Sequence, residues 1–83
     1  SSTEEFYVSD TNNHVIRVVS LKERRVRTLC GTPQQSGHEN GLHNQSKFSY
    51  PLGLSLDLHS NYLYVTDTDN FVVKRVSLSG EVR

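Results

Sequence analysis

The sequence has little of what marks many specialised proteins: it has one cysteine, no net charge and no long apolar run. Cys30 is the single cysteine, so the chain cannot close a disulfide within itself. Nine basic residues balance nine acidic ones, and this neutrality gives no electrostatic reason to expect a nucleic-acid partner. No apolar stretch approaches the ~20 residues that a membrane span requires, and no secretory leader is recognisable. We therefore expect one small domain of 83 residues without a membrane span.

What the sequence does contain is an internal repeat. Residues 6–21, FYVSDTNNHVIRVVSL, return as residues 63–78, LYVTDTDNFVVKRVSL, with nine of sixteen positions identical. The similarity continues after a one-residue slip, because the Val-Arg pair at 26–27 matches the pair at 82–83. Self-similarity at a fixed spacing is typical of proteins that stack copies of one structural unit.

Each copy predicts a strand, a tight turn and a second strand. The turns are Asp-Thr-x-Asn segments, whose residues favour turn conformations and tolerate positive φ. We expect Asp10 and Asn13, and their counterparts Asp67 and Asn70, to be structural turn residues, with each aspartate accepting hydrogen bonds from the turn's backbone amides. Ligand binding by the aspartates is the less favoured interpretation.

The strand after each turn is apolar on both faces, which indicates a sheet covered on both sides. Arg17 and Lys74 occupy equivalent positions in these strands. We expect their stems to lie along the sheet and their charges to reach a carboxylate or a carbonyl, as long cations do beside apolar surface.

Four basic residues gather in one short segment, Lys22, Arg24, Arg25 and Arg27. A nucleic-acid patch is one interpretation. A solvated hairpin tip is favoured, because the second copy keeps the turn at 79–81 without the charge.

The segment 31–51 predicts a long connection rich in Gly, Gln, Ser, Asn and His. His38 and His43 lie in it and His59 follows, but no cysteine or close second histidine supplies metal-ligand spacing. We expect no metal and no cofactor. Asn44 begins an Asn-Gln-Ser glycosylation triplet, which matters only if the protein is secreted.

The stretch after this connection alternates large and small residues. Leucines at 52, 54, 56 and 58 are expected to fill one interface, while Gly53 and Ser55 leave room for a neighbouring sheet on the other side. This pattern predicts a strand at a crowded centre.

Taken together, these motifs resemble the NHL repeat. The strand PLGLSLD at 51–57, the strand and turn LYVTDTDN at 63–70, and VKRV at 73–76 match its pattern, as do Asn13-His14 and Ile16-Arg17 in the first copy. Phe71 replaces the family's His and Val73 its Ile. The rival is the YWTD-type propeller repeat, which has Trp where this chain has Val.

The resemblance implies an all-β fold of antiparallel β-propeller blades arranged around a channel. Residues 6–30 would be a partial blade of three strands, 31–51 a long inter-blade loop, and 52–83 a second blade with a truncated last strand. Because fewer than two blades cannot close a ring, we expect a fragment whose remaining blades come from the parent chain or from other copies.

The resemblance also implies a non-catalytic scaffold that binds a protein partner. If the 52–58 strand is innermost, the turns and the connection emerge on one face of the ring. The candidate binding residues on that face are Asn12, His14, His38, His43, Asp69 and Phe71.

The resemblance also brings two other functions that are known among related propellers. RNA binding is the alternative, although the neutral charge does not support it. A metal-containing lyase or hydrolase is less favoured, because the expected channel strand offers only Ser55 and Asp57 and no nucleophile–base pair.

Overall fold

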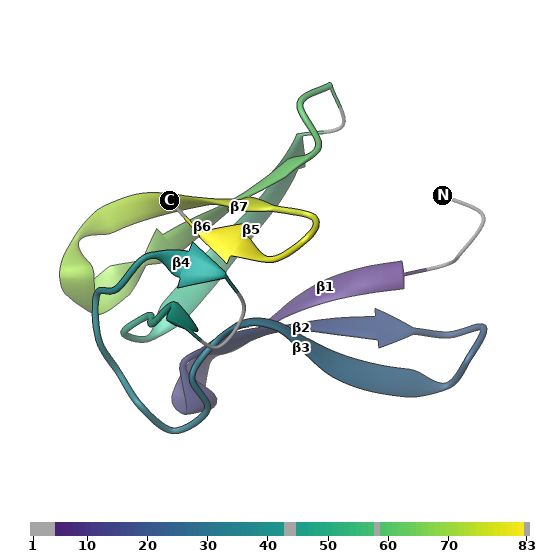
Figure 1. The fold of residues 1–83 in the computed structure, drawn as a ribbon, viewed down its shortest axis with the longest axis horizontal. Helices are drawn as coiled ribbons and strands as arrows, with labels where there is room; N and C mark the ends of the chain where they lie inside the picture. Colours follow the sequence, from purple (N-terminus) through teal and green to yellow (C-terminus); the bar gives the residue numbers. More distant parts are fainter. Residues whose placement is uncertain (1–4, 43–44, 58, 83) are drawn as a thin grey trace.

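The first copy of the repeat forms a three-stranded sheet. The computed structural model describes residues 5–42, 45–57 and 59–82. Sheet one has the order β1-β2-β3, with all strands antiparallel (Figure 1). Its strands are β1 (Glu5–Asp10), β2 (Val15–Ser20) and β3 (Arg25–Gly31).

The second copy forms the centre of a five-stranded sheet, called sheet two. Its order is β4-β8-β7-β6-β5, again antiparallel. The strands β4 and β5 are consecutive in the sequence but lie at opposite edges of this sheet. Its strands are β4 (Gly41–Leu42), β5 (Pro51–Asp57), β6 (Tyr62–Asp67), β7 (Val72–Ser77) and β8 (Glu81–Val82).

The segment 31–51 is therefore more than the loop that its composition predicts. Gly41 and Leu42 pair with Val82 and Glu81 and extend sheet two beyond β8. A strand of two residues is too short to show an alternating pattern in the sequence. Its position is determined by pairing with the edge of β8, which has no other partner on that side.

Both hairpins between the first two strands of each copy use the same turn. A 3₁₀ turn covers Thr11–Asn13 in one copy and Thr68–Asn70 in the other. Each ends in a residue with positive φ, 62° at His14 and 56° at Phe71. The described residues contain no α-helix, and none of their helical turns is long and apolar enough to cross a membrane.

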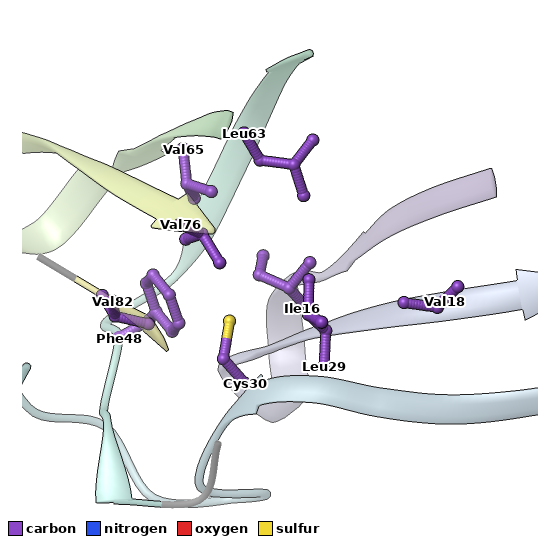
Figure 2. Close-up of a cluster of buried hydrophobic side chains, with 9 residues drawn as sticks. All are labelled: Ile16, Val18, Leu29, Cys30, Phe48, Leu63, Val65, Val76 and Val82. Atoms are coloured by element: carbon purple, nitrogen blue, oxygen red, sulfur yellow. The ribbon is translucent and has the colours of Figure 1, made fainter. Parts of the chain in front are cut away.

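The hydrophobic core lies between the two sheets. Phe48 from the connection joins it and is fully buried (Figure 2). The other members are Ile16, Val18, Leu29 and Cys30 from sheet one, and Leu63, Val65, Val76 and Val82 from sheet two.

The expected leucine interface of β5 is largely wrong. Leu52 is 65% exposed and Leu56 41% exposed, and only Leu54 packs against the core. A register shift between Pro51 and Leu54 breaks the expected alternation at Leu52, whereas Leu56 follows the shift in regular register and is exposed near the end of the strand. Leu58 lies outside the described residues.

Coverage of the second strand differs between the copies. No residue of β2 is exposed, as its apolar pattern predicts. In β7, by contrast, Val72 and Val73 are 38% and 64% exposed, and because adjacent side chains on a strand point to opposite faces, both faces are open at the start of β7.

Candidate binding face

The connection between the sheets is bound to the turn of the first copy. Gln34 N donates to Asn13 O at 2.8 Å, and Tyr50 N donates to His14 Nδ1 at 3.0 Å. The Tyr50 ring meets the His14 imidazole edge to face, with 4.5 Å between ring centroids. Hydrogen bonds and a ring contact therefore fix the connection to this turn.

The same connection is bound to the turn of the second copy. Asp69 N donates to Ser49 O at 3.1 Å, and Asn70 Nδ2 donates to Gly37 O at 2.8 Å. Both turns and the connection consequently form one surface, which we call the turn face. It comprises residues 11–14, 34–42, 45–50 and 68–71.

The first turn is closed by side chains. Asp10 Oδ2 accepts from Asn13 Nδ2 at 3.0 Å and from Arg17 Nε at 3.1 Å, and Arg17 also donates to Thr28 Oγ1. The Asn13 hydrogen bond, followed by Arg17, holds the pKa of Asp10 below its ordinary value. The expectation that Asp10 caps the turn's backbone amides is wrong, because its side chain makes no such bond. The carboxylate instead accepts hydrogen bonds from the asparagine amide and the arginine guanidinium.

The second turn repeats this arrangement in a buried setting. Asp67 has no exposed surface; its Oδ2 accepts from Asn70 Nδ2 at 2.7 Å and lies 3.7 Å from Lys74 Nζ. Its Oδ1 accepts from Ser49 N at 2.6 Å, so it also binds the connection, and like Asp10 its side chain caps no backbone amide of its own turn.

Lys74 is held on several sides at once. Its ammonium donates to Lys47 O at 2.9 Å and lies 5.3 Å from the centre of the Phe48 ring. Burial lowers its pKa, and the Asp67 carboxylate opposes that effect. The expectation that the charges of Arg17 and Lys74 reach a carboxylate or a carbonyl is confirmed.

The two residues after the turns have opposite environments. His14 is 8% exposed beneath Tyr50, whereas Phe71 is 93% exposed. The placement of His14 on a solvent-facing binding surface is therefore wrong, because the Tyr50 ring covers the imidazole. Tyr50 is distant in sequence and no local pattern points to that contact.

The remaining candidates divide by position. Asn12, His38 and Asp69 are exposed on the turn face. His43, like the glycosylation candidate Asn44, lies outside the described residues. Ser46, the last residue of that triplet, is fully buried, and its Oγ accepts from Gly31 N at 2.9 Å.

The two polar residues expected on the channel strand serve a local turn or lie exposed. Asp57 accepts hydrogen bonds from Ser60 Oγ at 2.8 Å and from His59 N at 3.0 Å, while Ser55 is exposed. Within residues 5–42, 45–57 and 59–82, no group of three or more His, Cys, Asp or Glu side chains is arranged to hold a metal ion.

Comparison with known proteins identifies the repeat. No family model matches the chain. It is 36% identical to the NHL repeat-containing protein 2 of Gallus gallus over 76 residues, and 36% identical to that of Homo sapiens over 72 residues, covering 92% and 87% of this chain. The chain is a segment of NHL repeats. These relatives are named for the NHL repeat and not for the YWTD repeat, so they favour the NHL assignment over the YWTD alternative.

A plant protein matches nearly the whole NHL segment as well. The segment is 31% identical over 75 residues, 90% of the segment's length, to Protein SUPPRESSOR OF QUENCHING 1, chloroplastic, of Arabidopsis thaliana. The segment spans about a tenth of the length of the NHL repeat-containing proteins that it matches.

A solved structure shares the fold. An auxiliary nutrient binding protein from Bacteroides thetaiotaomicron matches 93% of this chain and 21% of its own, with a TM-score of 0.76 and 17% sequence identity. The NHL segment is all-β, and its two antiparallel sheets are blades of an incomplete propeller that is not closed.

Proposed function

We propose that this NHL segment is a non-catalytic part of an interaction scaffold and binds a protein partner through its turn face. The observation that carries the proposal is Phe71, an aromatic side chain 93% exposed on a turn. Contiguous exposed apolar surface marks interaction sites, and aromatic residues are enriched among the side chains that contribute most of the binding energy of interfaces.

The turn that bears Phe71 is held rigidly. Phe71 N donates to Thr68 O at 3.2 Å, and the adjacent Asn70 is tied to both Asp67 and Gly37. An anchor on a rigid support loses little conformational entropy when it binds.

The surroundings of Phe71 suit a protein more than RNA. Val72 and Val73 extend the apolar surface, and Asp69 adds a negative charge beside it. Lys47, a cation of the turn face, lies 3.7 Å from Glu39 Oε2. The exposed cations Lys22, Arg24 and Arg25 lie instead at the β2–β3 hairpin.

Substitution of Phe71 tests the proposal. The chain and its Phe71→Ser variant are used to capture proteins from a lysate of the source cells, and each captured protein is purified and titrated against both. We expect Phe71→Ser to weaken the specific partner by about thirtyfold or more, as for an interface anchor worth ~2 kcal/mol.

The matched control is Val26→Ser, which removes another apolar side chain that is 65% exposed and lies off the turn face. It is expected to leave binding unchanged, and circular dichroism checks that both variants are folded. A partner that binds Phe71→Ser as tightly as the parent chain contradicts the proposal. Captured RNA that survives purification and binds directly supports the alternative.

A further inference from the structure

One peptide group of the connection is bound to the turns of both copies at once. The N–H of the Ser49–Tyr50 peptide donates to His14 Nδ1 at 3.0 Å, beside the first turn. The C=O of the same peptide accepts from Asp69 N at 3.1 Å, in the second turn. Because a peptide group is planar and rotates as a unit, a rotation that breaks one of these hydrogen bonds also disturbs the other.

Tyr50 has a backbone conformation that depends on such contacts. Its φ of 54° lies in the left-handed region, which residues with a Cβ adopt at a cost. Proline follows it, and a residue before proline favours an extended conformation. A strained conformation of this kind persists where the surrounding structure fixes it. A return of φ to negative values, with a compensating change at Ser49, turns the Ser49–Tyr50 peptide away from His14.

The hydrogen bond to His14 requires a neutral imidazole. A backbone amide is always a donor, so Nδ1 is the unprotonated nitrogen and the ring proton lies on Nε2. A protonated imidazole carries a hydrogen on both nitrogens, and its Nδ1–H would face the Tyr50 N–H with no acceptor between them. Histidine ordinarily changes its charge between pH 5 and 8. The contact is therefore complete at the upper end of this range and is lost toward the lower end.

The charged groups of the elements packed around this contact are largely paired with one another. The ion pairs are Asp10–Arg17 beside the first turn, Glu39–Lys47 in the connection and Asp67–Lys74 beside the second turn. The strand β3 brings the uncharged Gly31 against the His14 backbone. The other titratable side chains that the structure describes in the two turns and the connection are Tyr50, His38 and Asp69. Because histidine alone among these types ordinarily titrates between pH 5 and 8, His14 controls the contact and His38 requires a control variant.

The second turn depends on the same two residues of the connection. Ser49 N donates to Asp67 Oδ1 at 2.6 Å, and Tyr50 O accepts from Thr68 N at 3.3 Å. Thr68 O in turn accepts from Phe71 N at 3.2 Å. Release of the Ser49–Tyr50 peptide from His14 therefore removes part of the support of the turn that presents Phe71.

We propose that His14 is a pH-sensitive switch of the turn face. Its protonation releases the Ser49–Tyr50 peptide from the first turn and thereby loosens the second turn, which carries Phe71. The surface binds its partner at neutral pH and releases it at mildly acidic pH. This inference rests on the proposed function, because it concerns the regulation of the same surface.

Two substitutions of His14 imitate its two charge states. His14→Asn places an amide oxygen close to the position of Nδ1, tolerates positive φ and does not titrate, so it keeps the hydrogen bond at every pH. His14→Phe keeps an aromatic ring against Tyr50 but offers no acceptor, so it resembles the protonated state at every pH. Phenylalanine is also the residue at the equivalent position of the second copy, Phe71.

Amide chemical shifts of the ¹⁵N-labelled chain between pH 8 and 5 provide the first test. We expect the amides of Tyr50 and Asp69 to follow one common titration curve in the parent chain. They should stay constant in His14→Asn and show the acid-form values throughout in His14→Phe. A chain with His38→Asn, His43→Asn and His59→Asn together should titrate as the parent does.

Three results of this titration overturn the proposal. They are a Tyr50 amide that does not move down to pH 5, an equal movement in His14→Asn, and global unfolding of the parent chain above pH 5 by circular dichroism, since the change is then not local. If His14→Phe does not fold, the comparison of the parent chain with His14→Asn still decides.

Binding separates this inference from the proposed function. The probe is the protein that the parent chain captures and the Phe71→Ser chain does not, titrated at both ends of the pH range. We expect about fivefold weaker binding by the parent chain at the acidic end, the effect of about one lost hydrogen bond, relative to His14→Asn. The same pH dependence in both chains overturns the proposal. If no captured protein depends on Phe71, the proposed function fails, and the amide titration still decides whether protonation of His14 releases Tyr50.

Discussion

Equivalent residues in the two copies form the same ion pair, but one pair is partly exposed to solvent and the other is buried. Arg17 and Lys74 both reach the aspartate that ends the preceding strand. The first pair is screened by water and contributes little free energy, whereas the second depends on its partners because neither charge is hydrated.

Replacing each cation by methionine measures this difference. Lys74→Met leaves the Asp67 carboxylate buried without its counter-charge and is expected to lower the free energy of unfolding by about 3–5 kcal/mol. Arg17→Met is expected to lower it by about 1 kcal/mol or less, because the Asp10–Arg17 pair is partly exposed. Urea unfolding of both variants provides the measurement, and equal losses would contradict the assigned environments.

Some of these residue roles can be predicted from the sequence and others cannot. That the charges of Arg17 and Lys74 reach a carboxylate or a carbonyl follows from their apolar neighbours on the same strand, so local pattern suffices. The burial of His14 does not follow, because the covering ring belongs to Tyr50 at the far end of the connection. The copies place His and Phe at the same turn position, and only the tertiary neighbour distinguishes them.

At the scale of elements, the segment 46–57 organises sheet two. It contributes the strand β5 at one edge, the buried Phe48 to the core and a carbonyl to Lys74. Its strand and turn character is visible in the sequence. Its hydrogen bonds to both turns depend on register and on partners far along the chain, which periodicity does not encode.

Truncating Phe48, the buried aromatic residue of this segment, measures how much the ring contributes to stability. Phe48→Ala removes a ring with no exposed surface and is expected to destabilise the chain by about 3–5 kcal/mol. Leu52→Ala alters a side chain of the same segment that is 65% exposed and should change stability by less than about 0.5 kcal/mol. Thermal unfolding compares the two, and a similar loss in both would indicate that Phe48 is not a core residue in solution.

For the whole molecule, stability depends on the contact between the two sheets. Cys30 lies in that contact with no exposed surface, and burial raises the pKa of its thiol from 9.0 to about 12. A pKa raised in the folded state gives a stabilising contribution that is complete below pH 9 and is lost as the pH rises toward 12.

The prediction is a loss of stability on the alkaline side that depends on Cys30. Between pH 9 and 11 the free energy of unfolding should fall by up to about 1.4 kcal/mol per pH unit through this group. The Cys30→Ala chain lacks the thiol and should show a flatter pH dependence, although it is less stable throughout. Lys74 is present in both chains, so the part of its opposite contribution that comes from burial and from Asp67 is common to both. Identical slopes in urea titrations across this range would contradict the burial of the thiol.

The placement of β4 and β5 at opposite edges also bears on the order in which the chain is made. During synthesis the residues of sheet one emerge first and can pair with one another at once, since each of its hairpins is local. Gly41 and Leu42 must wait for Glu81 and Val82 before their strand has a partner. A ribosome that stalls between β6 and β8 therefore holds a paired first sheet beside an unfinished second one, with Phe48 and the apolar side of β6 exposed to chaperones and to misassociation.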